Sequence, residues 1–139
     1  MKAKNKFKME LDAKSANESF ARLAVAGFAS QLDPTVEFLA DVKTAVSEAV
    51  TNCIVHAYKN CGGKIYLSAE LYDDGIKITV RDKGCGIEDV EKALEPLYTT
   101  DQSGDRSGMG FAIMGSFTDK LKVYSKPGSG TRVVMRKKL

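Results

Sequence analysis

The chain has 139 residues and a mass of 15.1 kDa, a length that suits one folded domain. Hydrophobic residues make up 43% and charged residues 28% of it, with 3 prolines and 12 glycines, which excludes collagen-like, coiled-coil and largely disordered chains. Its net charge of +3 is too weak a field to argue for direct contact with nucleic acid. We therefore expect a single globular domain over residues 1–139.

The cysteines and the apolar stretches indicate the cellular compartment of the protein. Cys53, Cys61 and Cys85 are odd in number and lack CxxC spacing, which favours free thiols in a reducing compartment over a disulfide or a Cys/His metal site. The basic N-terminus has no apolar h-region of a signal peptide. The longest apolar stretch, residues 23–29, is far shorter than the ~20 residues that span a bilayer. We expect a cytoplasmic protein without a membrane partner.

One strand and two helices are predicted in the first half of the chain. Residues 7–11 alternate between apolar and charged types, as in a strand with one buried face. Ser15 and Glu18 have the spacing of a capping box at the start of a first helix. Asp33 and Pro34 suit the N-cap and first position of a second helix, and apolar residues then keep helical phase to Ala57.

The second half alternates mainly with the period of strands. Residues 65–71 and 76–80 form a hairpin around a short turn, and residues 121–125 and 131–137 form another. Short helical patterns cover residues 88–95 and 108–117. Antiparallel strands with one apolar face need helices on that face only, so we predict an α+β fold, a two-layer sandwich with a mostly antiparallel sheet.

A row of polar side chains marks one side of the predicted second helix. Glu48, Asn52 and His56 are four residues apart and share that side. They could form a solvated polar face. Alternatively, the carboxylate is a base next to an amide oxygen that binds Mg²⁺.

Asp82, Gly84 and Gly86 leave the end of a predicted strand. The glycines could serve a tight turn, and Asp89 stands where a dinucleotide fingerprint needs its third glycine. An aspartate held at such a strand end can accept a hydrogen bond from an amino group such as that of adenine.

Residues 106–111 place glycines at the start of a helix, where free amides and the helix dipole favour an anion. The lysine of a Walker loop and the H-R-D and D-F-G motifs of eukaryotic protein kinases are missing from the sequence. Residues 98–105 are polar, as in a surface loop or in a lid that closes on a nucleotide.

The order of these motifs resembles the Bergerat ATP-binding fold shared by gyrase, Hsp90, MutL and histidine kinases. Within that superfamily the chain is similar, over nearly its whole length, to the anti-sigma-factor serine kinases of sporulating bacteria. Five segments carry the resemblance: residues 17–22, 31–35, 46–52, 96–100 and 106–111.

The resemblance implies roles for individual residues. Glu48 would be the general base, Asn52 would hold Mg²⁺, and Asp82 would read the adenine amino group. Arg106 would reach the γ-phosphate as a second catalytic residue, and Arg22 would contact protein partners. The remaining nucleotide contacts would be Gly84, Gly86, Thr99, Thr100, Ser107, Gly108, Met109, Gly110, Phe111 and Thr131, with His56 kept as a structural residue.

The resemblance also implies a function. Such a protein would form a homodimer, bind ATP or ADP with Mg²⁺, and inhibit the sporulation sigma factor F. It would phosphorylate the anti-anti-sigma antagonist (SpoIIAA-like) on a serine. The alternative is a general-stress anti-sigma kinase of the RsbW type, with the same chemistry and a different sigma factor.

Overall fold

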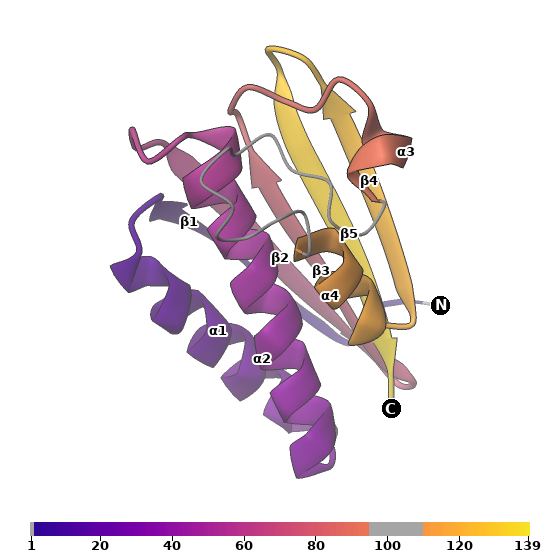
Figure 1. The fold of residues 1–139 in the computed structure, drawn as a ribbon. Coiled ribbons are helices and arrows are strands. Elements are labelled where there is room, and N and C mark those ends of the chain that lie inside the picture. Colours follow the sequence, from indigo (N-terminus) through magenta and orange to yellow (C-terminus); the bar gives the residue numbers. More distant parts are fainter. Residues whose placement is uncertain (1, 95–109) are drawn as a thin grey trace.

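A computed structural model describes residues 2–94 and 110–139 of the chain (Figure 1). The elements in chain order are β1 (Asn5–Asp12), α1 (Ala16–Ala29), the 3₁₀ turn η1 (Ser30–Leu32), α2 (Val36–Thr51), the π-helical turn η2 (Asn52–Ala57), β2 (Lys64–Tyr72), β3 (Gly75–Asp82), α3 (Val90–Ala93), α4 (Gly110–Ser116), β4 (Lys120–Lys126) and β5 (Gly130–Lys138).

The described strands form one sheet in the order β1-β2-β3-β5-β4, with every neighbouring pair antiparallel. Helices α1, α2 and α4 lie together on one face of this sheet (Figure 1). The predicted α+β sandwich with an antiparallel sheet is therefore confirmed. The last strand, β5, is inserted between β3 and β4, which brings Thr131 opposite Asp82.

The core lies between the sheet and the helices. Alternate residues of β2 and β3 point inward, among them Leu67, Leu71 and Ile78, each at most 1% exposed. Val46 and Val50 of α2 pack against them and are fully buried. Each such side chain contributes about 1.5–3 kcal/mol by leaving water, so the face that the alternation predicted is also the face that stabilises the fold.

The predicted capping box at Ser15 is wrong. Ser15 already has helical backbone angles, and its side chain makes no capping hydrogen bond. The chain is instead held at this corner by Asn17, whose amide group donates to the carbonyl of Asp12 at 2.8 Å. Glu18 pairs with Arg22, one turn further along α1, at 3.7 Å.

The start of the second helix also differs from the prediction. Asp33 has a left-handed backbone conformation with φ 52°, and Thr35 is the N-cap of α2. Its hydroxyl accepts a hydrogen bond from the amide of Phe38 at 3.0 Å. Asp33-Pro34 thus serves the turn before the helix and not its first residues.

The predicted helical run to Ala57 is confirmed, but its last turn is π-helical. The amide of Tyr58 donates to the carbonyl of Cys53, five residues back, at 3.0 Å. Lys59 and Asn60 then take left-handed backbone angles and end the helix. Single π turns inside helices are rare and are often found at functional sites.

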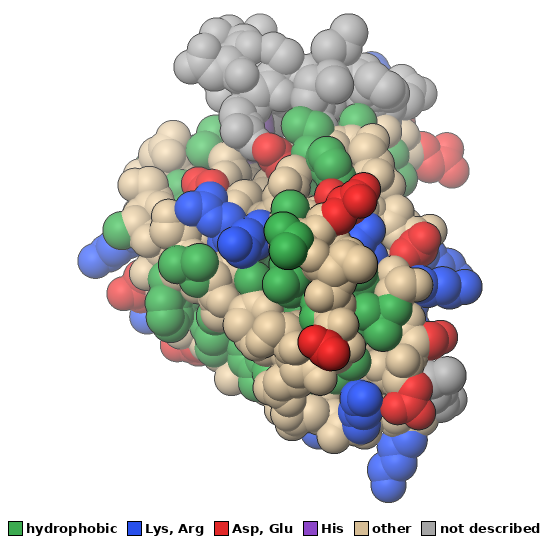
Figure 2. Space-filling view, turned by 90° about the horizontal axis from the view of Figure 1, so that it is seen from below, with side chains coloured by type: hydrophobic (Ala, Val, Ile, Leu, Met, Phe, Trp, Pro, Cys, Tyr) green, Lys and Arg blue, Asp and Glu red, His purple; other side chains and the backbone are tan. Residues whose placement is uncertain are grey.

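The surface mixes charged and apolar side chains. On the face shown in Figure 2, lysines and arginines lie among acidic side chains, with hydrophobic groups exposed between them. Within residues 2–94 and 110–139, no helix is long and apolar enough to cross a membrane.

Candidate functional site

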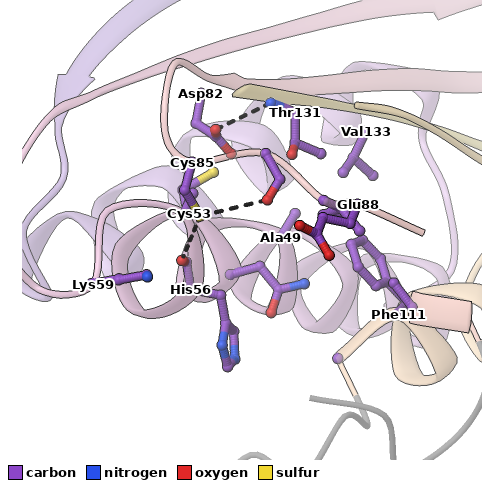
Figure 3. Close-up of a pocket in the computed structure, with 16 residues that line it drawn as sticks. Ala49, Cys53, His56, Lys59, Asp82, Cys85, Glu88, Phe111, Thr131 and Val133 are labelled. Atoms are coloured by element: carbon purple, nitrogen blue, oxygen red, sulfur yellow. Dashed lines mark hydrogen bonds between the residues drawn. The ribbon is translucent and has the colours of Figure 1, made fainter. Parts of the chain in front are cut away.

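A cavity of about 200 Å³ opens where the end of α2, the end of β3 and the start of α4 meet (Figure 3). Six of the residues predicted for the site line it, among them Asn52 from η2, Asp82 from β3, and Phe111 and Thr131 from the last third of the chain. Gly86 and Gly110 also line it. Segments that are far apart in the sequence therefore build one pocket.

Asp82 is the buried carboxylate of this cavity, with only 4% of its surface exposed. Its Oδ1 accepts hydrogen bonds from the amides of Gly84 at 2.9 Å and Thr131 at 3.2 Å. Burial raises the pKa of this carboxyl above its usual range, while the two amides and the thiol of Cys53 oppose the shift. The carboxylate is thus fixed through Oδ1 in an apolar wall, and it can accept a further hydrogen bond from a ligand.

Hydroxyl groups continue this network along the sheet. The hydroxyls of Thr131 and Ser125 lie 2.8 Å apart, on paired positions of β5 and β4. Ser125 also accepts a hydrogen bond from the amide of Ile87, at 2.8 Å. The loop after β3 is therefore fastened to the last hairpin of the chain.

Gly84 and Gly86 are needed for close packing of that loop. A side chain at Gly84 would collide with the backbone of Ala57, to which the amide of Cys85 donates at 3.1 Å. Gly86 has φ 76° and lies against the backbone of Lys126. The loop is fixed between the end of the helical layer and the β4–β5 turn.

Tyr58 holds the end of β3 from the other side. Its hydroxyl donates to the carbonyl of Lys64 at 2.5 Å and accepts from the amide of Lys83 at 2.7 Å. Lys83 directly follows Asp82, so the tyrosine fixes the backbone next to the buried carboxylate. Its ring occupies the space that a side chain at Gly63 would need.

Asn52 is the first residue of the π turn and faces the start of α4. A Cβ on Gly110 would lie 2.8 Å from the amide oxygen of Asn52, so α4 can approach only because Gly110 has no side chain. An amide oxygen in this position is a suitable ligand for a hard cation such as Mg²⁺.

The row of Glu48, Asn52 and His56 is only partly in the cavity wall. Asn52 and His56 line it, whereas Glu48 is half-buried one turn earlier on α2 and is not among its described lining residues. His56, expected to be structural, thus belongs to the wall. The spacing of these three residues places them on one side of a regular helix. It does not show that the helix becomes π-helical at Asn52, so the sequence could not tell which of the three line the cavity.

Several wall residues were missed because they are apolar or small. Ala49, Ala57, Ala93 and Val133 line the cavity without any chemistry that a motif could mark. Cys53 was read only as a free thiol, but it is buried beside Asp82 with 4% of its surface exposed, and burial raises the pKa of its thiol well above the ordinary value. Lys59, Cys85, Ile87 and Glu88 complete the described wall.

Arg22 lies outside the cavity, on α1. Its guanidinium donates to the hydroxyls of Ser19 at 3.1 Å and Ser47 of α2 at 3.3 Å. It therefore links α1 to α2 at Ser47, the residue that precedes Glu48. The other predicted site residues, Thr99, Thr100, Arg106, Ser107, Gly108 and Met109, lie outside the described residues.

Comparison with known proteins shows the family. The family described as "Histidine kinase-like ATPase domain" matches residues 11–137. The anti-sigma F factor of Clostridium acetobutylicum is 55% identical over 96% of this chain and 94% of its own length. The anti-sigma F factor of Caldanaerobacter subterraneus subsp. tengcongensis is 56% identical over 99% of this chain and 96% of its own.

Solved structures share the fold at lower identity. The RsbU and RsbW domains of Rv1364c from Mycobacterium tuberculosis match with a TM-score of 0.70 at 20% identity, covering 97% of this chain and 32% of that one. The catalytic domain of histidine kinase ThkA matches with a TM-score of 0.59 at 16% identity, covering 95% of each chain. The curated names do not favour the general-stress alternative. The chain belongs to the histidine kinase-like ATPase family and, within it, to the anti-sigma F factors.

Proposed function

We propose that this protein captures sigma factor F and phosphorylates an anti-anti-sigma antagonist on serine with Mg-ATP. The observation that carries the proposal is the buried carboxylate of Asp82 in the wall of a cavity that also contains Asn52. A nucleotide needs these two groups, one to accept from the adenine amino group and one to hold the metal that neutralises its phosphates. The apolar wall of Ala49, Ala93 and Val133 suits a flat base.

The residues present fit such a ligand. Asp82 is fixed through one oxygen by two amides, so it can hold the base in one orientation. Asn52 lies where α4 begins, and α4 is brought close by Gly110. Bound Mg-ATP would supply the phosphoryl group and the metal charge. The protein excludes water, positions the groups and orients the acceptor.

Glu48 is proposed as the group that orients the serine hydroxyl and takes its proton. It lies on the same side of α2 as Asn52, one turn away. General-base groups of this kind contribute ~10²–10⁴-fold in rate. Arg106, with the amides of residues 107–110, is proposed to stabilise charge on the phosphates, as the resemblance implies.

The partner surface is proposed on α1. Phe20 and Leu23 are 52% and 58% exposed, and Arg22 lies between them in the sequence. Exposed apolar side chains suit protein contact, both for sigma factor capture and for a homodimer, and Arg22, on another side of α1, is proposed as a partner contact from the resemblance. Arg22→Ala is expected to weaken sigma factor capture, with Lys43→Ala as a control on the neighbouring helix.

Intact mass spectrometry tests the kinase activity. Purified protein, Mg-ATP and the antagonist are mixed, and one added phosphoryl group on a serine is expected. Glu48→Gln should keep ATP binding and lose transfer at least ~100-fold, whereas Glu37→Gln, in the exposed first turn of the same helix, should behave as the parent. Unchanged transfer by Glu48→Gln would remove Glu48 from this role. Tight ATP binding without any transfer would leave a nucleotide-gated binding protein.

A further inference from the structure

The outer face of the sheet, opposite the helices, is strongly basic over three neighbouring strands. The strand register turns Lys77 and Arg81 of β3, Arg132 and Arg136 of β5, and Lys120 and Lys122 of β4 to this side. We call these six residues the basic face. No acidic residue of β3, β4 or β5 points the same way, but Glu70 of the neighbouring strand β2 does, and it pairs with Lys77 at 3.8 Å.

The basic face is hollowed at one end. A depression of about 580 Å³ is lined by all of its members except Arg81, together with Tyr72 and Tyr124. Asp74 and Asp119, from the turns that flank the strands, also line it. A surface with this excess of cations recruits a partner that carries regularly spaced negative charge.

Tyrosine rings are interleaved with the arginines. The guanidinium of Arg132 lies over the ring of Tyr124 with 4.5 Å to the centroid, and that of Arg136 lies over Tyr72 at 5.5 Å. Arg81 is 5.8 Å from the ring of Tyr66. Each pair places a guanidinium group next to an aromatic ring on the sheet, and nucleic-acid bases stack on aromatic rings and on guanidinium planes.

We propose that the basic face binds single-stranded RNA. Alternate residues of one strand are about 6.6–6.8 Å apart, close to the spacing of phosphates in an extended single strand. The open face of a sheet suits a single strand, because duplex grooves are read by inserted helices or ribbons. Ser68 of β2 and Thr79 of β3, paired beside the basic face, add hydroxyls that can hydrogen-bond a ribose 2′-OH.

The basic face is not apparent from the net charge of the chain. A value of +3 averages the basic face with the acidic residues of the helical layer, such as Glu37, Asp41 and Glu48. The net charge of the whole chain therefore does not exclude nucleic acid from one side of the sheet. Acidic polypeptides are the competing partners, but their carboxylates do not stack on the arginine and tyrosine side chains as nucleic-acid bases do.

Fluorescence anisotropy with a labelled uridine 12-mer tests the proposal on the full chain. If about four phosphates are contacted, the affinity should fall about 50-fold between 50 and 200 mM salt, from a slope of ~0.7 per phosphate. The double variant Lys122→Glu/Arg132→Glu should bind at least ~10-fold more weakly. Lys14→Glu/Lys43→Glu, with the same change in net charge away from the basic face, should bind within about twofold of the parent.

Further measurements separate RNA from its rivals. Tyr124→Ala should weaken binding and Tyr124→Phe should retain it, because only the ring is needed. Saturating ADP should leave RNA binding intact, and all variants should keep their ADP affinity, which shows that they are folded. Competition by ADP, equal loss in the two double variants, equal binding of a thymidine 12-mer, or equal binding of a polyglutamate peptide would each overturn the proposal.

Discussion

Removing the hydroxyl of Tyr58 tests how the end of β3 is held. In Tyr58→Phe the ring remains against Gly63, but two hydrogen bonds are lost, one to the carbonyl of Lys64 and one from the amide of Lys83. Such bonds contribute ~0.5–1.5 kcal/mol each to stability. Because both backbone partners lie in an exposed region, water can replace part of each bond. We expect a loss of about 1–2 kcal/mol in the free energy of unfolding.

Urea unfolding measures this loss. With a slope of ~2 kcal/mol/M, the midpoint should move down by about 0.5–1 M at unchanged slope. Tyr72→Phe is the matched control, since its hydroxyl donates to Glu70 on the sheet surface at 2.8 Å, and it should change stability by less than ~0.5 kcal/mol.

The same variant should also weaken ADP binding, because the backbone beside Asp82 loses its anchor. Tyr72→Phe should leave ADP affinity unchanged. If Tyr58→Phe unfolds at the parent's midpoint and binds ADP as the parent does, the hydroxyl holds neither the end of β3 nor the backbone beside Asp82.

Three further predictions follow from single contacts. Gly110→Ala should displace the amide of Asn52 and reduce the Mg²⁺ dependence of ATP affinity, measured by calorimetry with and without Mg²⁺. Adenosine affinity should fall as the pH drops through the raised pKa of Asp82, since only the ionised carboxylate accepts through both oxygens, and Asp82→Asn should bind weakly at every pH. Thr35→Ala should destabilise the fold by ~1 kcal/mol in thermal unfolding, because α2 loses its N-cap.

Matched variants distinguish these effects from general damage. Gly115→Ala adds a methyl group to the same helix α4 in ordinary contact with Leu121, so its Mg²⁺ dependence should equal that of the parent. Ser15→Ala removes a hydroxyl that caps nothing and should cost less than ~0.5 kcal/mol. Equal losses for Thr35→Ala and Ser15→Ala would contradict the assignment of the cap.

The strands were predictable from the sequence because their signal is local. Alternation in residues 65–71 and 76–80 depends only on which side of a strand faces the core, and the turn at Asp73 and Asp74 fixes the pairing. The helix starts were not predictable in detail. Ser15, Asp33 and Thr35 all have side chains that can cap, and the choice among them depends on how α1 and α2 pack.

The site was predictable only where chemistry shows in single residues. Asp82 and Asn52 stand out as polar groups next to glycines or on a helix face. Their depth in the structure depends on β5 and α4, which no local pattern places against them. The widening of the helix at Asn52 likewise follows from the backbone bond between Tyr58 and Cys53, not from residue type.

The position of β5 has a consequence for the order of events during synthesis. The amide of Thr131 that binds the buried carboxylate of Asp82 lies 49 residues further along the chain. At ~5–20 residues per second, the ribosome needs about 2–10 s to make that stretch. For this time the nascent chain has α1, α2 and β3 but not the wall that Thr131 and Val133 supply. The nucleotide cavity is thus completed last, and a chain interrupted before β5 cannot carry it.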